Sequence, residues 1–173
     1  REKIFPLSKK EKIEYQQSLL KRKTPYEILK EEHTIYKYRN LIELNYETDQ
    51  AFLSKNNKIR IITDGKEKFK LLFEDIKNAK QYIHIQYYIL KKDGIGKQLF
   101  SLLEQKLKEG VQVYILYDDI GSRKLSISSL KNLTDNNAKI KSFFKSRFPL
   151  INFRMNYRNH RKVTIIDNRV AFV

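Results

Sequence analysis

The sequence has 173 residues, enough for one domain with a substantial core but few for two. An apolar fraction of 40% with 12% aromatic residues excludes intrinsic disorder, and the lack of cysteine excludes disulfides and thiol nucleophiles. No apolar stretch approaches the roughly 18 residues of a membrane-spanning helix, and no signal-peptide pattern opens the sequence. Because it begins at Arg1 and ends within an apolar strand pattern, we expect a segment of a longer protein.

The net charge of +16 is concentrated in the carboxyl-terminal part of the sequence. Residues 1–55 carry net +3, whereas residues 56–173 carry net +13. Within the second part, residues 123–169 hold 12 basic side chains against two acidic ones. A field of one sign attracts phosphate-bearing partners such as nucleic acid, anionic lipid surfaces or phosphorylated small molecules. A solvated, lysine-rich surface without a partner is the alternative.

The first 55 residues are polar and favour helices. Ser8 with Glu11, and Thr24 with Glu27, have the spacing of helix starts. No alternation of apolar and polar residues indicates a strand in this part. We therefore predict a helical amino-terminal arm or linker over residues 1–55.

From residue 58 the pattern changes to alternating strands and helices. The expected order is a strand at 58–62, a helix at 66–80, a strand at 81–90, a helix at 96–109, a strand at 111–117, a helix at 126–133, a strand at 138–144, and a hairpin of 161–166 with 169–173. This order predicts an α/β fold with a mostly parallel sheet sandwiched by helices, in a domain of residues 56–173.

The clearest chemical pattern lies at residues 159–167, Asn-His-Arg-Lys-Val-Thr-Ile-Ile-Asp. Residues two apart on a strand share a face, so His160 and Lys162 place an imidazole beside an ammonium. The imidazole can displace an alkoxide from a phosphodiester while Lys162 balances charge on the non-bridging oxygens. Asp167 falls on the opposite face and joins the site only if a turn or bulge redirects it. On spacing alone, a surface strand carrying a His and a Lys is the simpler interpretation.

Two other places hold candidate site residues. His84 shares a strand face with Tyr82 and Tyr88, and it either lines the same cleft or is a satisfied histidine in a half-buried strand. Asp118 and Asp119 follow a strand, where they bind a cation, position a hydroxyl, or cap the turn. The histidines lie far apart without carboxylates at ligand spacing, so we expect neither a metal site nor a cofactor.

These residues resemble the phospholipase D superfamily, whose His-x-Lys-x4-Asp motif matches His160, Lys162 and Asp167. Several further stretches resemble bacterial cardiolipin synthases in the same order. They are residues 83–89, 93–96, 110–113, 118–122 and 156–162. The similarity covers residues 58–173 and indicates the first catalytic half of such an enzyme.

The resemblance implies transfer of a phosphatidyl group from one phosphatidylglycerol to another, giving cardiolipin and glycerol through a phosphohistidine intermediate. It makes His160 the nucleophile or its acid partner, Lys162 the phosphate clamp and Asp167 a supporting residue. Arg158 and Asn159 are expected either to contact phosphate or to support the residues that do.

The expected partners are phosphatidylglycerol, an anionic membrane surface and the second catalytic half of the same protein. We expect the protein at the bacterial cell membrane, and we expect no nucleic acid partner. Family members carry two such motifs and this sequence carries one, so we expect little turnover from these residues alone. One alternative is a nuclease of the superfamily that builds its site from two identical chains. Another is a non-enzymatic module that docks on anionic membranes or nucleic acid. The basic, aromatic loop at 145–159 suits a lipid interface and base stacking equally.

Overall fold

The computed structural model describes residues 13–14, 17–18, 21–25, 27–28, 33–49, 51–54, 57–144 and 158–173. The chain divides into two compact units, Arg1–Ile61 and Ile62–Val173. In chain order the helices and strands are η1 (His33–Tyr38), α3 (Arg39–Asp49), α4 (Gly65–Asn78), β1 (Tyr82–Tyr87), α5 (Gly94–Lys108), β2 (Gln112–Asp118), α6 (Ile127–Asp135), β3 (Lys139–Phe143), β4 (Val163–Ile166) and β5 (Val170–Phe172).

The first unit contains helices, as the sequence predicts. The Glu27 backbone N–H donates to Thr24 Oγ1 at 3.4 Å, and the Thr24 N–H donates to the Glu27 carboxylate at 2.6 Å. This reciprocal pair is a capping box and confirms the helix start predicted there. The other predicted start, Ser8 with Glu11, lies outside the described residues.

The second unit is an α/β domain, which confirms the predicted fold class. Its described residues form a five-stranded sheet in the order β3-β2-β1-β4-β5. β1, β2 and β3 run parallel, whereas β4 pairs antiparallel with β1 and β5 pairs antiparallel with β4. The sheet is therefore mixed, because the carboxyl-terminal hairpin joins it in the reverse direction.

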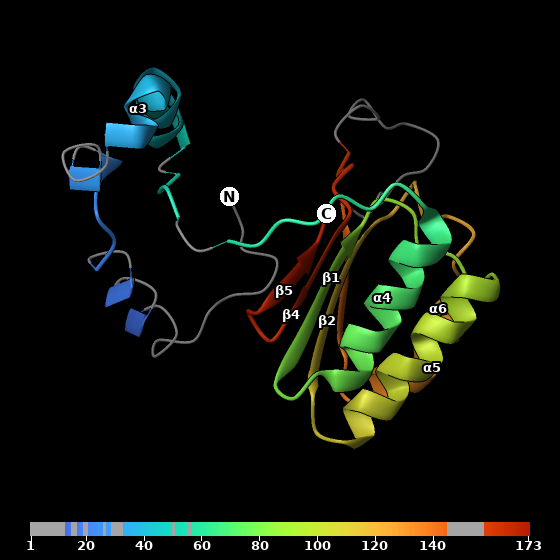
Figure 1. Ribbon diagram of the computed structural model, residues 1–173. Helices are drawn as coiled ribbons and strands as arrows, with labels where there is room; N and C mark the ends of the chain where they lie inside the picture. Colours follow the sequence, from blue (N-terminus) through green and yellow to red (C-terminus); the bar gives the residue numbers. More distant parts are fainter. Residues whose placement is uncertain are drawn as a thin grey trace. The chain divides into compact units, whose positions relative to one another are not determined.

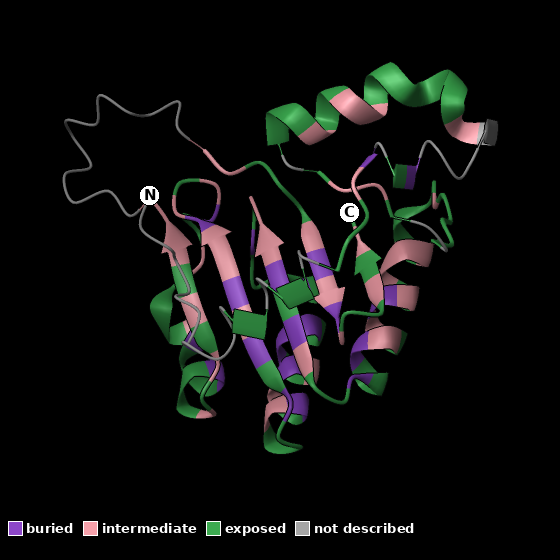
Figure 2. Cartoon of the chain, turned by 90° about the vertical axis from the view of Figure 1, so that its left-hand side faces the viewer, coloured by how far each residue is buried: buried purple, intermediate pink, exposed green. Residues whose placement is uncertain are grey.

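Helices α4, α5 and α6 lie on one side of this sheet (Figure 1). Figure 2 looks onto the other side, where none of the described helices of this unit covers the strands. The core lies between the sheet and the three helices, and its most deeply buried members include Leu72, Ile76, Ile83, Leu103 and Ile115. Each such side chain contributes roughly 1.5–3 kcal/mol by leaving water.

Two turns show why the chain changes direction where the sequence predicts. Gly110, after α5, has φ +87°, a left-handed conformation that glycine adopts without strain. Asp167 and Asn168, between β4 and β5, have φ 51° and 52°. The Arg169 N–H donates to the Ile166 carbonyl at 3.0 Å across these two residues, Ile166 pairs with Val170, and the predicted hairpin is confirmed.

The strand predicted at residues 58–62 is wrong. These residues have no regular secondary structure, and Ile59 and Ile61 are each 86% exposed. Their β-branched side chains favour an extended backbone, but a strand also needs a hydrogen-bonded neighbour, and no described strand pairs with this segment. No helix in the described parts of the chain combines the length and apolar character needed to cross a bilayer.

Candidate active site

The candidate site lies at one edge of the sheet, which we call the carboxyl edge because β1 and β2 end there. β4 runs antiparallel to β1, with Val163 opposite Gln86 and Ile166 opposite Ile83. The residues just before β4 therefore lie beside the end of β1. The rings of His160 and Tyr88 stack there, with centroids 4.2 Å apart and planes inclined by 21°.

His160 and Lys162 lie just before β4, because the strand predicted from residue 161 begins at Val163, so the shared strand face predicted for them is not formed. Both residues are exposed, and Lys162 Nζ donates to the backbone carbonyl of His160 at 3.2 Å. An exposed imidazole with one face covered by Tyr88 keeps its ring nitrogens accessible to an incoming phosphate. The Lys162 ammonium, which is bonded to the His160 backbone carbonyl, supplies positive charge that attracts a phosphoryl group.

Asn159 shapes the turn that carries His160. Its side-chain Oδ1 accepts the Arg161 N–H at 3.2 Å, and its own N–H donates to Asp118 Oδ2 at 3.0 Å. Arg158, immediately before it, is half-buried. The role of Arg158 and Asn159 as phosphate contacts stays a prediction, and the structure adds a local role for Asn159.

Asp118, the last residue of β2, is fully buried. Its Oδ1 accepts the N–H groups of Ile120 at 3.1 Å and Gly121 at 2.9 Å, while Oδ2 accepts the Asn159 N–H. Of the alternatives left open by the sequence, turn capping is the one these contacts support. The same carboxylate also ties the turn to the segment that carries His160.

Asp167 lies at the opposite edge of the sheet, which we call the amino edge. Its carboxylate accepts the backbone N–H groups of Lys80 at 2.7 Å, Gln81 at 2.8 Å and Tyr82 at 2.9 Å, at the start of β1. Partial burial by itself raises the pKa of Asp167, but these three donors and the nearby Arg169 charge lower the pKa by more. No turn or bulge redirects Asp167 toward His160, so the structure does not bring these two residues together.

Comparison with known proteins shows the family of the chain. Residues 72–173 match the family described as "Cardiolipin synthase, PLD-like domain". The chain belongs to this family. The resemblance inferred from the sequence motifs is therefore confirmed.

Three relatives show how much of a full-length protein the chain covers. Cardiolipin synthase 1 of Staphylococcus epidermidis is 47% identical over 139 residues, which are 80% of this chain and 28% of the relative. Cardiolipin synthase 2 of the same species is 42% identical over 179 residues, which are 100% of this chain and 36% of the relative. Cardiolipin synthase of Oceanobacillus iheyensis is 45% identical over 139 residues, with 80% and 29% covered. The chain spans about a third of these relatives.

Two solved structures are similar at lower identity. NucT from Helicobacter pylori is 20% identical with a TM-score of 0.45, covering 61% of this chain and 64% of that chain. The phospholipase D family member Nuc from Salmonella typhimurium is 24% identical with a TM-score of 0.41, and 57% of each chain is covered.

In this phospholipase D-like domain, His84 lies in the middle of β1 and apart from His160. Its ring packs between Tyr82, with centroids 4.8 Å apart, and Tyr114, at 4.7 Å. His84 is exposed as a whole residue, and partial burial of its imidazole lowers its pKa. Because His84 and Tyr88 are four positions apart, His84 lies roughly 13 Å from the stacked pair along the chain. Its place in a shared substrate cleft stays a prediction.

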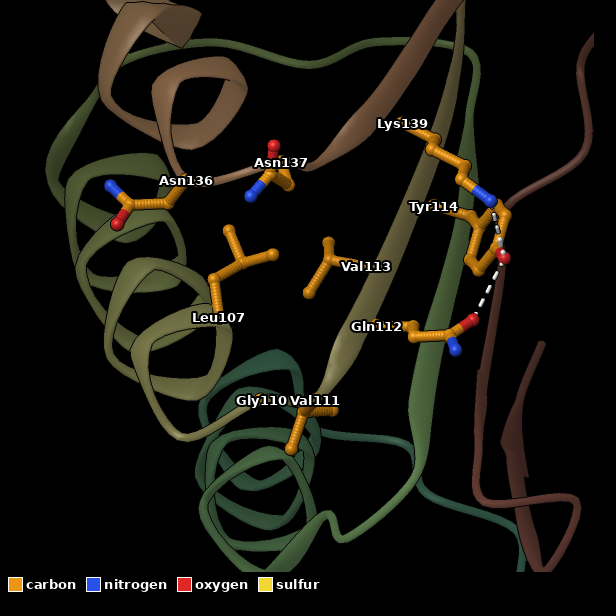
Figure 3. Close-up of a pocket in the computed structure, with 9 residues that line it drawn as sticks. All are labelled: Leu107, Gly110, Val111, Gln112, Val113, Tyr114, Asn136, Asn137 and Lys139. Carbon is orange, nitrogen blue, oxygen red and sulfur yellow. Dashed lines mark hydrogen bonds between the residues drawn. The ribbon is translucent and has the colours of Figure 1, made fainter.

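A cavity of about 200 Å³ lies at the amino edge, where β2 and β3 begin (Figure 3). Leu107 and Val113 line its apolar side. On its polar side, Tyr114 donates to Gln112 Oε1 at 2.9 Å and accepts from Lys139 Nζ at 3.1 Å. It contains none of the site residues that the sequence predicts.

Tyr88 contacts His160 in this candidate site, a role that the sequence does not indicate. The alternation of β1 places Tyr88 on a face with His84, but it does not say which residue of a distant segment contacts it. Within the described residues, no group of three or more histidine and acidic side chains is placed to hold a metal ion.

Proposed function

We propose that this domain supplies the first catalytic half of a cardiolipin synthase. Such an enzyme transfers a phosphatidyl group from one phosphatidylglycerol to a hydroxyl of another, and it releases glycerol. The observation that carries the proposal is the exposed His160, whose imidazole stacks on Tyr88 at the carboxyl edge and whose backbone carbonyl accepts from Lys162 Nζ. Family membership and the names of the relatives support the substrate class.

His160 acts as the nucleophile or as the acid that protonates the leaving group. As nucleophile, its ring nitrogen attacks phosphorus, the bond from phosphorus to the headgroup glycerol oxygen breaks, and glycerol leaves with a proton from a second acid. A hydroxyl of a second phosphatidylglycerol then attacks the phosphohistidine and loses its proton to the same group. The P–N bond breaks, cardiolipin forms and His160 is regenerated. The second acid would come from the other catalytic half of the protein.

The ammonium of Lys162 would bind the non-bridging phosphate oxygens during both steps. Charge on these oxygens is balanced best by groups already in place, because no solvent then has to reorganise. Arg158 and Arg161, on either side of His160, would add to this positive field.

We also propose that the carboxyl edge faces an anionic membrane surface. Large apolar side chains are exposed at or beside the loops that follow β1 and β2. They are Ile89, Ile95, Ile120 and Ile127. Exposed cations lie in the same loops. They are Lys91, Lys92, Arg123 and Lys124. Apolar side chains can enter the headgroup region of a bilayer while cations meet anionic lipids, and a phosphatidylglycerol headgroup would then reach His160. The domain would accordingly act at the bacterial cell membrane.

The test uses the whole gene product in membranes, with phosphatidylglycerol as substrate. We expect His160→Ala to abolish cardiolipin formation and the acid-labile phosphoprotein intermediate, whereas His33→Ala, a matched change in the amino-terminal unit, leaves both in place. Cardiolipin formation that survives His160→Ala would contradict the catalytic assignment. Cleavage of DNA without action on phosphatidylglycerol would instead favour the nuclease alternative.

A further inference from the structure

We infer that the Asp118–Ser122 turn and Tyr88 form a positioning device that holds the His160 imidazole for reaction. The turn follows β2, Tyr88 follows β1, and His160 precedes β4, so three separate segments of the chain meet at this point. The inference deepens the proposed function, since positioning matters only if His160 reacts. The contacts that hold the imidazole are present without substrate.

The first contact runs from the turn to the backbone beside His160. Asp118 uses one carboxylate oxygen to hold the turn closed and the other to accept the Asn159 N–H. The carboxylate is fully buried, so water does not compete for these bonds. Because Asn159 adjoins His160, this bond restrains the peptide from which the imidazole projects.

The second contact runs from the turn to Tyr88. Ser122 Oγ donates to the Tyr88 carbonyl at 3.2 Å and accepts the Leu90 N–H at 2.9 Å, bridging the segment on either side of Ile89. Gly121 lies so close that a Cβ there would be 2.2 Å from the Tyr88 carbonyl oxygen and 2.9 Å from its ring. Only glycine fits this approach without displacing Tyr88.

The two contacts converge on one ring. The turn holds Tyr88 on one side and the Asn159 peptide on the other, and His160 stacks on Tyr88 while projecting from the residue after Asn159. The imidazole thus loses rotational freedom at both its base and its face. A phosphohistidine must form and break at the same ring nitrogen, and misplacement by about 1 Å can cost about 100-fold in rate.

The spectroscopic test uses the whole protein labelled with ¹³C-histidine, in which the His160 signals are assigned by their loss in His160→Gln. A stacked aromatic ring shifts the imidazole protons upfield. We expect Tyr88→Phe to keep this shift and Tyr88→Leu to lose it. Asp118→Asn and Gly121→Ala should move the signals as well, because they release the segments that hold the two rings. Signals that do not move in Tyr88→Leu would overturn the inference whether or not the protein acts on phosphatidylglycerol.

The kinetic test separates positioning from general damage. We expect Tyr88→Leu and Asp118→Asn each to lower kcat about 10- to 100-fold with little change in KM, whereas Tyr88→Phe stays within about threefold of the unaltered enzyme. The double variant should lose less than the product of the single losses, because both act through His160. An equal loss in Tyr88→Phe and Tyr88→Leu would contradict the role of the ring. If Asp118→Asn fails to fold, the comparison of Tyr88→Phe with Tyr88→Leu still tests whether the ring positions His160.

Discussion

His160 and Asp167 lie at opposite edges of the sheet, because the whole of β4 separates them. A seven-residue extended span places them roughly 20 Å apart. Both belong to the sequence motif that resembles one catalytic constellation, yet the carboxylate of Asp167 is occupied by backbone N–H groups at the start of β1. The motif therefore places a candidate reactive residue before β4 and an anchoring residue after it.

Asp167→Asn should lower the free energy of unfolding by about 1–3 kcal/mol, because three backbone donors lose a charged acceptor. Chemical denaturation of the variant and the unaltered chain measures this difference. Asp135→Asn is the matched control, since Asp135 pairs with Lys131 at 2.7 Å on the surface of α6 and should contribute little. Equal unfolding energies for Asp167→Asn and the unaltered chain would contradict the anchoring role.

His84 should make the domain less stable as the pH falls below the ordinary histidine pKa of about 6.5. Partial burial of its imidazole lowers its folded-state pKa, so the unfolded chain binds the proton more readily. The stabilisation is therefore complete above the unfolded pKa and is lost as the pH falls toward and through the folded one. Urea unfolding at pH 7.5 and pH 5.5 should show a smaller difference in His84→Gln than in the unaltered chain. An unchanged difference would refute this assignment.

The order of helices and strands could be predicted because each element follows from local periodicity. The turns at Gly110 and Asp167-Asn168 could be predicted from residue types that tolerate positive φ. The contacts between residues of the site could not be predicted. Asp118 meets Asn159 across 41 positions, and Tyr88 meets His160 across more, through a strand register that a single sequence does not specify. Alternation predicts Asp167 on the strand face opposite His160, but it does not indicate that the backbone N–H groups of residues 80–82 bind its carboxylate. The prediction of a strand at 58–62 was wrong for the same reason, since a strand forms only where another strand lies beside it to pair with.

Lys162→Gln should lower kcat for cardiolipin formation by about 100-fold, since the variant removes a fixed positive charge from beside the reacting phosphate. Lys162→Arg should recover part of the rate, because the charge is kept while its position changes. Lys131→Gln, an exposed lysine on α6, serves as the control and should leave the rate unchanged. The measurement is initial rate against phosphatidylglycerol concentration in membranes. A Lys162→Gln enzyme with full kcat would exclude the ammonium from the reaction.

Ile127→Glu should weaken binding of the chain to phosphatidylglycerol vesicles by about tenfold or more, because an apolar contact with the bilayer is lost and a negative charge is added. Ile127 is suited to this test because it is 81% exposed at the start of α6, so its replacement disturbs no core packing. Gln112→Glu adds the same charge at the amino edge, where we expect no contact with the bilayer.

Vesicle co-sedimentation at two salt concentrations measures how strongly each variant binds and how far its binding depends on charge. Binding should fall as salt rises and should be weak on neutral phosphatidylcholine, since the cations around Ile127 then lack anionic partners. If Gln112→Glu weakens binding as much as Ile127→Glu, the attraction depends on net charge alone. The carboxyl edge would then have no preferred orientation toward the membrane, and delivery of the headgroup to His160 would need another surface.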